Sequence, residues 1–482
     1  MDLERLIGAL APAEVLNPTA VDVVDLAYDT RSVAPGALFF CVRGQRRDGH
    51  ELATDAVEAG AVALVVDHAL DVAVPQLVVP DTRAAMAQAA AEFFGHPSQE
   101  LTIAGVTGTN GKTTTTFLLF AILAAAARRP GLLGTVEVRV GGERRPALRT
   151  TPEAIDLQRT LREMLDAGDR SCAMEATSHG SELGRLSGTR FAAIAFTNLS
   201  QDHLDLHGTM ERYFDAKRRL FVEGEPPPAA VNVGDEYGRR LADELRRLDR
   251  APLLTFAYEG EADLVPDSVE LSPCGARIGL DGLELESPLL GRFNVENVLA
   301  AVAVARLLEI PDDAIAQGIA SVRGVPGRFE AVDEGQPFLV VVDYSHKPDA
   351  LQSALAAARG LAEGRVICVF GCAGDRDRGK RPLMARAAEE GSDVAILTSD
   401  NPRSEDPEAI VREVLTGASG DMAVEVDRRK AIERAIELAQ PGDFVLVAGK
   451  GHETYQELRD GTISFDDREV AREALRRQRA KA

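Results

Sequence analysis

A glycine-rich turn between an apolar run and a long apolar stretch constrains the fold of this chain more than any other feature. Leu101-Thr102-Ile103-Ala104 is followed by Gly105-Val106-Thr107-Gly108-Thr109-Asn110-Gly111-Lys112-Thr113-Thr114. Glycines let backbone N–H groups close around phosphate oxygens, Lys112 can reach the β- and γ-phosphates, and the Thr113 hydroxyl can hold Mg²⁺. We expect a strand, a phosphate-binding loop and a helix, although a standard P-loop has glycine at Val106. The alternative is a Gly/Thr loop without a ligand.

Length and composition indicate a globular protein of about three domains. The chain has 482 residues, 45% of them hydrophobic, and a net charge of −22. This charge argues against a nucleic-acid or anionic-membrane partner, because both need a basic face. Five scattered cysteines are typical of free thiols in a reducing compartment. No signal peptide is visible and the longest apolar run, 117–127, is too short to span a bilayer, so we expect a cytoplasmic protein, and a monomer.

The apolar runs predict an α/β fold in three domains. Residues 1–97 alternate helical and strand patterns and form a small α/β domain. Residues 98–325 begin with the phosphate loop and alternate strand and helix, which predicts a P-loop ATPase-like domain with a doubly wound sheet. Between 264 and 290 the pattern predicts antiparallel hairpins. Residues 326–482 form a second, Rossmann-like α/β domain. Its four apolar strands are expected at 338–342, 366–370, 394–397 and 444–447.

Polar clusters follow two of the expected central strands. One begins at Glu175 and the other contains His203. Because open α/β sheets bind ligands outside the carboxyl ends of their strands, carboxylate and imidazole here predict a site for a divalent metal that bridges nucleotide phosphates. His203 and His207 have a zinc-like spacing without a third local ligand, and zinc is the weaker interpretation. Lys217 lies in a helical stretch whose composition alone indicates a solvated cationic face.

Polar segments also follow the expected strands of the third domain. They are Asp343-Tyr344-Ser345-His346-Lys347, Gly371-Cys372-Ala373-Gly374-Asp375-Arg376, Ser399-Asp400-Asn401-Pro402-Arg403 and Gly449-Lys450-Gly451-His452-Glu453. Arginine can clamp a carboxylate and a carboxylate can hold an ammonium group, so this edge could bind a zwitterion. The alternatives are helix capping for Asp400 and Asn401 and a buried ion pair for Arg376.

Taken in order, these segments resemble the Mur ligase family over nearly the whole chain. The motifs that carry the resemblance are Gly108 to Thr114, Glu175-Ala176-Thr177-Ser178-His179, Thr197-Asn198-Leu199-Ser200, Asp202-His203-Leu204-Asp205, Gly291-Arg292-Phe293-Asn294-Val295-Glu296-Asn297, Pro326-Gly327-Arg328 and Gly449-Lys450-Gly451-His452-Glu453. Asp400-Asn401-Pro402-Arg403 matches the members that use meso-diaminopimelate.

The resemblance implies a uridine-nucleotide domain, a central ATPase and an amino-acid domain. It implies an ADP-forming ligase of peptidoglycan synthesis, which adds meso-diaminopimelate to UDP-N-acetylmuramoyl-L-alanyl-D-glutamate. The D-glutamyl carboxylate would attack ATP to give an acyl phosphate, and the incoming amine would displace phosphate. ATP and Mg²⁺ are the implied cofactors.

The resemblance also assigns residues to these roles. Lys112, Lys217, His203 and Glu175 are implied to be catalytic. Thr113, Glu175 and His203 would bind Mg²⁺ with Lys217, which matches the lysine that the family carboxylates with CO₂. The residues implied to bind ATP are Gly108, Thr109, Asn110, Gly111, Lys112, Thr113, Thr114, Asn294, Arg328 and Asp343. Those implied to bind the UDP-sugar dipeptide are Tyr28, Thr30, Gln45, Arg46, Arg47, Thr150, Thr151, Thr177 and Arg185. Those implied to bind the amino acid are Arg376, Asp400, Asn401, Pro402, Arg403, Gly449 and Glu453.

Other functions remain open at this point. Within the same class, the chain could add lysine or ornithine, or act in folate polyglutamylation. From another class, it could be a P-loop switch or ATP-binding module without ligase chemistry.

Overall fold

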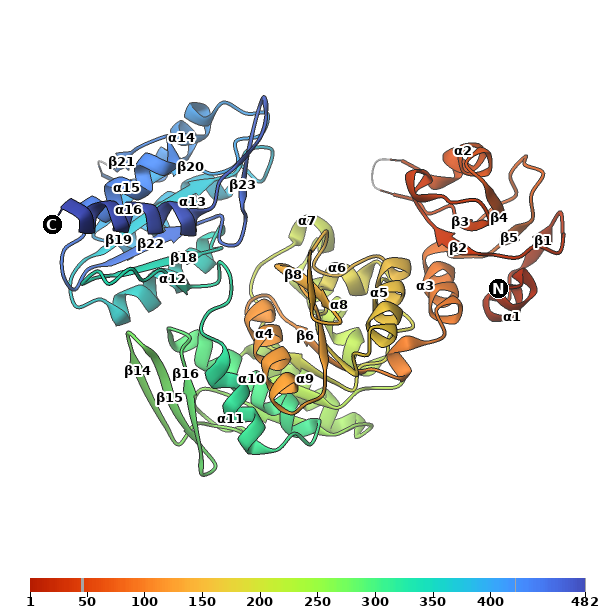
Figure 1. Ribbon diagram of the computed structural model, residues 1–482, viewed down its shortest axis with the longest axis horizontal. Helices are drawn as coiled ribbons and strands as arrows, with labels where there is room; N and C mark the ends of the chain where they lie inside the picture. The colour runs from red at the N-terminus through yellow and green to blue at the C-terminus, as the bar shows by residue number, and fades with distance from the viewer. Residues whose placement is uncertain (45–46, 421, 482) are drawn as a thin grey trace. The chain divides into compact units, whose positions relative to one another are not determined.

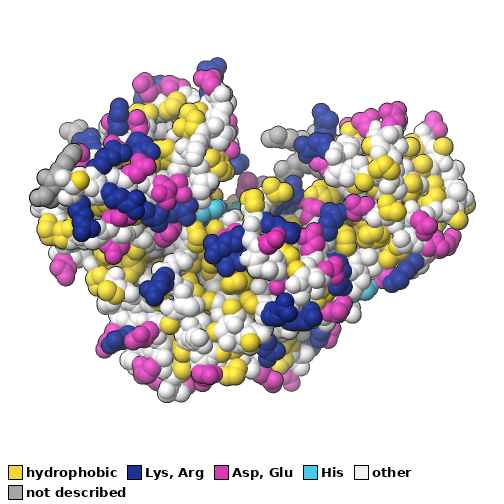
Figure 2. Space-filling model, in the orientation of Figure 1, with side chains coloured by type: hydrophobic (Ala, Val, Ile, Leu, Met, Phe, Trp, Pro, Cys, Tyr) yellow, Lys and Arg dark blue, Asp and Glu magenta, His cyan; other side chains and the backbone are white. Residues whose placement is uncertain are grey.

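The computed structural model describes residues 1–44, 47–420 and 422–481. Two compact units can be distinguished, residues 1–264 with 300–315 and residues 265–299 with 316–482. Among the described residues, no helix combines the length and hydropathy that crossing a bilayer requires. All five cysteines are free, as expected, and Cys274 alone is exposed. On the face shown in Figure 2, Lys and Arg side chains are interspersed with Asp and Glu.

The N-terminal part of the first unit is a five-stranded sheet with helices. The strand order is β1-β5-β4-β3-β2, and β1 is the antiparallel member. Its apolar strands are buried, as the sequence pattern predicted. The elements are α1 (Leu3–Leu10), β1 (Glu14–Leu16), β2 (Asp25–Ala27), η1 (Thr30–Ser32), β3 (Ala37–Phe40), η2 (Gly49–Leu52), α2 (Ala53–Glu58), β4 (Ala61–Val66), β5 (Gln76–Val78), α3 (Thr82–Phe93) and η3 (Pro97–Gln99).

The central sheet of the same unit has the strand order β13-β12-β11-β6-β10-β7-β8-β9. The first six strands are parallel, which confirms the doubly wound pattern, and β8 and β9 add an antiparallel hairpin that the sequence did not predict. The strands are β6 (Thr102–Thr107), β7 (Pro130–Leu133), β8 (Glu137–Val140), β9 (Glu143–Pro146), β10 (Ser171–Glu175), β11 (Ala193–Phe196), β12 (Ala229–Asn232) and β13 (Leu253–Phe256). The helices are α4 (Lys112–Ala125), α5 (Ala154–Asp166), α6 (Ser178–Glu182), α7 (Leu204–His207), α8 (Met210–Val222) and α9 (Glu236–Leu248).

An antiparallel sheet and two helices follow in the chain. The sheet has the order β14-β15-β16, so the hairpins predicted between 264 and 290 are confirmed. The elements are β14 (Ser268–Ser272), β15 (Gly275–Leu280), β16 (Leu283–Ser287), α10 (Arg292–Leu307) and α11 (Asp312–Ser321).

The C-terminal part is a six-stranded sheet covered by helices on both faces (Figure 1). Its order is β17-β18-β22-β19-β20-β21, parallel except for β17. Alternate residues of the strands face opposite sides: Val341 packs with α12, α13 and α14, and Val340 packs with α15 and α16. Burial on both faces explains why these strands are continuous apolar runs.

The elements of this part are β17 (Glu330–Ala331), β18 (Leu339–Asp343), α12 (Pro348–Leu361), β19 (Val366–Cys372), α13 (Lys380–Gly391), β20 (Val394–Ser399), α14 (Pro407–Leu415), β21 (Ala423–Val424), α15 (Arg428–Leu438), β22 (Phe444–Ala448), β23 (Tyr455–Leu458), β24 (Gly461–Ser464) and α16 (Asp467–Lys481).

Candidate active site

The phosphate loop, Gly108 to Gly111, connects β6 to α4. Gly108 has a φ of +148°, and a Cβ atom there would lie 1.9 Å from Thr197 Oγ1, so the position requires glycine. Two residues that follow β11 hold the loop: Thr197 Oγ1 donates to Asn110 O at 2.6 Å, and Asn198 Oδ1 accepts from Asn110 N at 2.9 Å. The loop is therefore fixed by the neighbouring strand.

Lys112, Thr113 and Thr114 form the first turn of α4. Lys112 Nζ donates to Gly108 O at 2.9 Å and to Thr109 O at 2.8 Å, so the ammonium group lies over the loop. Thr113 and Thr114 are buried. A helix N-terminus, a glycine loop and a lysine at one place fit the phosphates of a nucleotide.

Lys217 on α8 reaches the same loop. Its side chain is only 1% exposed, its Nζ donates to Gly108 O at 2.8 Å, and it lies 4.7 Å from the centre of the Tyr213 ring. The interpretation as a solvated cationic face is wrong, because this face of α8 is turned inward. Tyr213, which sequence reasoning missed, also bonds the loop through its hydroxyl, 3.1 Å from Thr109 Oγ1. Its spacing of four residues from Lys217 was the available signal.

Glu175 ends β10, the strand beside β6. It is 1% exposed, its Oε1 accepts from Thr135 N at 2.7 Å and its Oε2 from Thr135 Oγ1 at 3.0 Å. Gly134 lets this carboxylate approach, since a Cβ atom there would lie 2.7 Å from Glu175 Oε1. Each carboxylate oxygen has further lone pairs, so the bonds to Thr135 leave acceptor capacity for a cation.

His203 precedes α7 with a positive φ of 52°. Its Nε2 lies 3.1 Å from Asp202 Oδ2, and its ring meets the rings of His179 and Tyr213 edge-on, at 4.5 and 6.0 Å between centroids. His207 is buried and its Nε2 lies 3.1 Å from Ser178 Oγ. Tyr213 thus connects His203 with the phosphate loop.

Four residues assigned to the UDP-sugar dipeptide are brought together beside Glu175. Thr151 Oγ1 donates to Glu175 O at 2.9 Å, Thr177 Oγ1 donates to Thr151 Oγ1 at 2.9 Å, and Arg185 donates to Thr151 O at 3.2 Å. Thr150 Oγ1 lies 3.0 Å from Thr135 Oγ1.

Arg185 in this group has an unusual environment. Its guanidinium pairs with Glu153 at 2.8 Å, whereas its buried Nε has no hydrogen-bond partner among the described residues. Burial lowers the pKa of the Arg185 guanidinium. A buried donor without a partner is costly in a folded protein and fits a place where a ligand binds.

The other described residues of the UDP-sugar set, Tyr28, Thr30 and Arg47, lie outside the strands of the N-terminal sheet. Tyr28 donates to Asp156 Oδ2 at 2.6 Å, and burial together with this carboxylate raises the pKa of its hydroxyl. Thr30 lies in η1 and Arg47 is exposed. Gln45 and Arg46 fall outside the described residues.

Three residues assigned to ATP belong to the second unit. Asn294 on α10 is buried; its side chain donates to Leu290 O, just before the helix, at 2.8 Å and accepts from Asn297 Nδ2 at 2.8 Å. Arg328 stacks over Tyr344 at 4.6 Å, and its buried Nε has no hydrogen-bond partner in the described chain. Asp343 ends β18 and accepts from Phe329 N at 2.8 Å and Ser345 N at 2.9 Å.

All the residues assigned to amino-acid binding except Arg376 lie close to the carboxyl ends of β20 and β22. Asn401 donates to Glu453 Oε2 at 2.9 Å, and Gly449, with a φ of +122°, lies where a Cβ atom would be 2.7 Å from Asp400 Oδ2. The capping alternative for Asp400 and Asn401 is wrong, because Asp406 caps α14.

The two arginines assigned to the amino acid, Arg403 and Arg376, lie in different environments. Arg403 has a φ of +53°, and its side chain donates to Glu457 Oε2 at 2.5 Å and Gly374 O at 2.8 Å. Pro402 precedes it, with its backbone close to Gly374. Arg376 is exposed, so its interpretation as a buried ion pair is wrong.

Sequence reasoning missed two buried cations behind this edge. Lys450 is fully buried and its Nζ donates to Asn401 Oδ1 at 2.9 Å and Glu453 Oε2 at 3.1 Å. Arg428 is fully buried against Asp467, at 2.6 Å. Asn401 and Asp467 are distant from these cations in sequence, so no local pattern indicated the two contacts.

We expect the stability of the second unit to depend on pH because of two histidines, His346 and His452. Burial lowers the pKa of His346 to about 4, with Lys380 contributing, and that of His452 to about 3, with Arg328 contributing. The unfolded chain takes up these protons below about pH 6.5, so stability is present above that pH and is lost as the pH falls toward 4 and then 3. We expect His346 alone to remove up to about 3 kcal/mol by pH 4.

Urea unfolding between pH 4 and 8 measures this effect. The variant His346→Asn should show a shallower decline of the unfolding free energy with falling pH, whereas His68→Gln, at a side chain that is 54% exposed, should keep a slope closer to the wild type. An unchanged slope in His346→Asn would contradict the assignment.

Comparison with known proteins agrees with this geometry. Residues 23–94 match the Mur ligase family, catalytic domain, residues 106–305 the Mur ligase middle domain, and residues 327–451 the Mur ligase, glutamate ligase domain. A UDP-N-acetylmuramoyl-L-alanyl-D-glutamate--2,6-diaminopimelate ligase from Solibacter usitatus is 48% identical and covers 99% of this chain and 98% of its own. A ligase of the same name from Geobacillus thermodenitrificans is 45% identical over 99% of this chain and 100% of its own.

A solved structure of an enzyme with that name is also similar. It has a TM-score of 0.70 and 35% sequence identity, and the match covers 95% of each chain. The resemblance seen in the sequence is therefore confirmed along the full length, and this chain belongs to the Mur ligase family.

Proposed function

We propose that this chain is an ATP-dependent, ADP-forming ligase that joins meso-diaminopimelate to UDP-N-acetylmuramoyl-L-alanyl-D-glutamate in peptidoglycan precursor synthesis. The observation that carries the proposal is the convergence of two lysine side chains, Lys112 and Lys217, on the carbonyl oxygen of Gly108. The full-length similarity to ligases named for diaminopimelate supports the substrate. The cytoplasmic location and monomeric state stay predictions.

The phosphate loop would bind ATP. Lys112 lies over the loop and can turn from the carbonyl oxygens of Gly108 and Thr109 to the phosphates, which are stronger acceptors. The first turn of α4 adds the backbone N–H groups of Lys112, Thr113 and Thr114, which have no partner within the helix. Following the family resemblance, we also assign Asn294, Arg328 and Asp343 to ATP. Arg328 offers a buried Nε without a hydrogen bond among the described residues.

The donors beside the loop suit Mg²⁺, which prefers oxygen ligands. Glu175 and Thr113 would hold it, with support from His203 and from Lys217. Mg²⁺ would neutralise charge on the phosphates during transfer. We also propose that Lys217 is carboxylated by CO₂, because a carbamate there would be an anion beside the metal instead of a cation. Its buried amine, aimed at the loop, supports this.

The chemistry follows from the nature of the reacting groups. A carboxylate is a poor electrophile, so its reaction with an amine requires a leaving group, which the γ-phosphoryl group of ATP provides. The part of the substrate that carries the reacting carboxylate would be held by Thr150, Thr151, Thr177 and Arg185. The buried Nε of Arg185, which has no hydrogen-bond partner among the described residues, offers a donor. Tyr28, Thr30, Gln45, Arg46 and Arg47 would bind the UDP-sugar.

The cluster at β20 and β22 would bind the amino acid. Diaminopimelate has a second carboxylate that lysine lacks, and Arg403 can hold it with two charged hydrogen bonds. Glu453 uses Oε2 for Asn401 and Lys450, so its Oε1 would take an ammonium group. Asp400, Asn401, Pro402 and Gly449 would shape the site, and Arg376 would approach from its exposed loop.

Phosphate release tests the function. With ATP and UDP-N-acetylmuramoyl-L-alanyl-D-glutamate present, we expect release to depend on the added amino acid and to be fastest with meso-diaminopimelate. Faster turnover with lysine or ornithine would contradict the substrate. Hydrolysis that is independent of every amino acid would indicate an ATP-binding module without ligase chemistry.

Arg403→Ala tests the specificity. We expect the kcat/KM for diaminopimelate to fall by about 10- to 150-fold, the range for a lost charged hydrogen bond. The slow turnover with lysine should not change, because lysine has no second carboxylate. Arg412→Ala removes an exposed arginine of α14 and serves as the control. An equal loss for both amino acids would show that Arg403 acts on the fold and does not clamp the carboxylate.

A further inference from the structure

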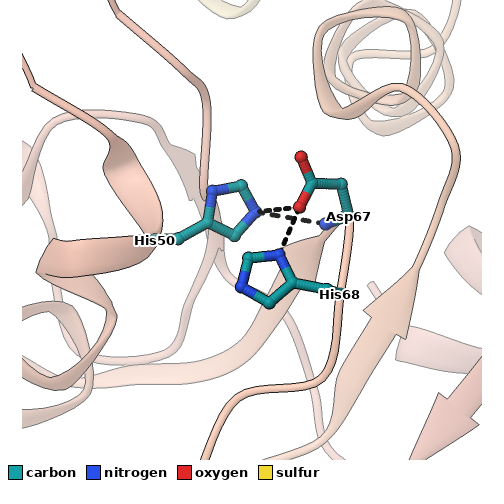
Figure 3. Close-up of side chains that lie close together, drawn as sticks. All are labelled: His50, Asp67 and His68. Atoms are coloured by element: carbon teal, nitrogen blue, oxygen red, sulfur yellow. Dashed lines mark hydrogen bonds and ion pairs between the residues drawn. The ribbon is translucent and has the colours of Figure 1, made fainter.

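Two histidines and an aspartate that have no assigned role in the ligase reaction meet beside the N-terminal sheet, close in sequence to Arg47. His50 lies in η2, and Asp67 and His68 follow directly after β4. Asp67 Oδ1 lies 3.2 Å from His50 Nε2 and 2.5 Å from His68 Nδ1 (Figure 3). The three ligand atoms lie within 4.8 Å of one another. Imidazole nitrogen and carboxylate oxygen are the ligands that zinc-like ions prefer.

The hydrogen bonds of His50 fix which nitrogen carries its proton. The backbone N–H of Asp67 can only donate, and it points to His50 Nε2 at 3.1 Å, so Nε2 is an acceptor. The proton is then on Nδ1, which donates to Asp48 Oδ1 at 2.6 Å. A histidine whose second nitrogen is held by a carboxylate is the arrangement that orients metal ligands.

In this tautomer, His50 Nε2 and Asp67 Oδ1 are both hydrogen-bond acceptors and lie next to each other. His50 Nε2 and the carboxylate oxygen Asp67 Oδ1 are 3.2 Å apart with no proton between them, and the Nε2 lone pair accepts from the Asp67 backbone N–H at 3.1 Å. The side chain of His50 is 4% exposed, so solvent does little to relieve this arrangement. A cation bound to both atoms would replace the backbone N–H as the partner of the Nε2 lone pair and would remove the repulsion between the two acceptors.

The spacing fits a tetrahedral ion. Zn²⁺ with bonds of about 2.0–2.2 Å to nitrogen and oxygen keeps its ligand atoms about 3.3–3.6 Å apart. The pair His50 Nε2 and Asp67 Oδ1 is close to this value. His68 must open its 2.5 Å hydrogen bond by about 1 Å to fit the same tetrahedron. Its ring stacks on His50 with 4.8 Å between centroids, and its side chain is 54% exposed, so this movement takes place at the surface.

Arg43 affects the same carboxylate. Its Nε donates to Asp67 Oδ2 at 2.8 Å and thereby turns Oδ1 toward the two rings. The Arg43 side chain is 65% exposed, so solvent and salt screen its charge.

We propose that His50, Asp67 and His68 bind one divalent transition-metal ion of the zinc class, with water in the fourth position. The role of the bound ion would be structural, because it would link η2 to the end of β4. The site is independent of the Mg²⁺ proposed for the ligase reaction and holds whether or not that proposal does.

The test is a titration of the full chain with Zn²⁺ after treatment with a chelator, in a Cys274→Ser background that removes the one exposed thiol. We expect one equivalent to bind and to raise the melting temperature. His68→Ala and Asp67→Asn should each weaken this binding at least tenfold, while Mg²⁺-dependent ligase turnover of His68→Ala stays at the wild-type rate.

A matched control separates the site from adventitious binding. His96→Ala also removes a partly exposed histidine paired with a carboxylate, and it should leave Zn²⁺ affinity unchanged. Cobalt in place of zinc should give the visible absorption of a tetrahedral site in the wild type and lose it in His68→Ala. Zn²⁺ binding that is equally tight in His68→Ala and Asp67→Asn, or absent from the wild type, would overturn the proposal.

Discussion

Replacing Lys217 with alanine should reduce ligase turnover by about 100- to 1,000-fold, the range for loss of one preorganised electrostatic group. The Lys217 amine is buried and lies 2.8 Å from the carbonyl of Gly108, so no other side chain can take its place from solvent. Added bicarbonate should restore little activity, since alanine has no amine to carboxylate. Phosphate release with saturating substrates measures the effect, and a wild-type rate would remove Lys217 from the mechanism.

Two further variants separate the possible roles of this lysine. Lys217→Arg keeps a positive charge but does not form the lysine carbamate, so it should be nearly as slow as Lys217→Ala if the carbamate is required. Labelling with ¹³C-bicarbonate should give a carbamate signal by NMR in the wild type that is lost in Lys217→Arg. Normal turnover in Lys217→Arg would rule out the carbamate while leaving a role for the cation. Lys430→Ala, at an exposed position, is the control.

Replacing Arg428 with methionine should lower the free energy of unfolding by about 3–5 kcal/mol. Arg428 and Asp467 have fully buried side chains, 2.6 Å apart, and removal of one partner leaves an unpaired buried charge. Arg428 also donates to Ser399 O at 3.4 Å and Ala448 O at 3.0 Å, the ends of β20 and β22. Loss of this link should raise the KM for the amino acid more than the KM for ATP.

A double variant tests the cause. Arg428→Met with Asp467→Leu removes both charges, so urea unfolding should recover most of the lost stability. Its KM for the amino acid should stay high, because the bonds to the strand ends remain absent. Equal stability of Arg428→Met and the wild type would contradict the importance of the pair.

The sequence predicted the buried strands of the sheets well and the exposed polar strands poorly. Strands such as β10 and β22 are buried on both faces, and burial on both faces leaves a continuous apolar run that can be read directly. The hairpin β8–β9 escaped prediction because β9 consists of exposed Glu143-Arg144-Arg145-Pro146, which has no apolar alternation. The same reason applies to β24, which is exposed throughout.

Lys217 and Lys450 show why the site could be predicted only in part. A charged residue on a helix is more often solvated than buried, and helical periodicity does not tell which charged side chain faces inward. Lys217 is buried because α8 packs against the phosphate loop, and Lys450 because Asn401 and Glu453 surround it. The contacts with Gly108 and Asn401 join residues that are far apart in the sequence.

The sequence by itself determined the order of the α/β elements, the position of the phosphate loop and, through resemblance, the family. These properties are local: they depend on apolar runs and on glycines such as Gly108, whose φ and close neighbour allow no side chain. Only the tertiary structure decided that Lys217 and Tyr213 face the loop, that Arg428 is buried against Asp467, and that His50 meets Asp67 and His68. These contacts join elements that are far apart in the chain, α8 with the phosphate loop, α15 with α16 and η2 with the end of β4, and the buried charges among them require partners.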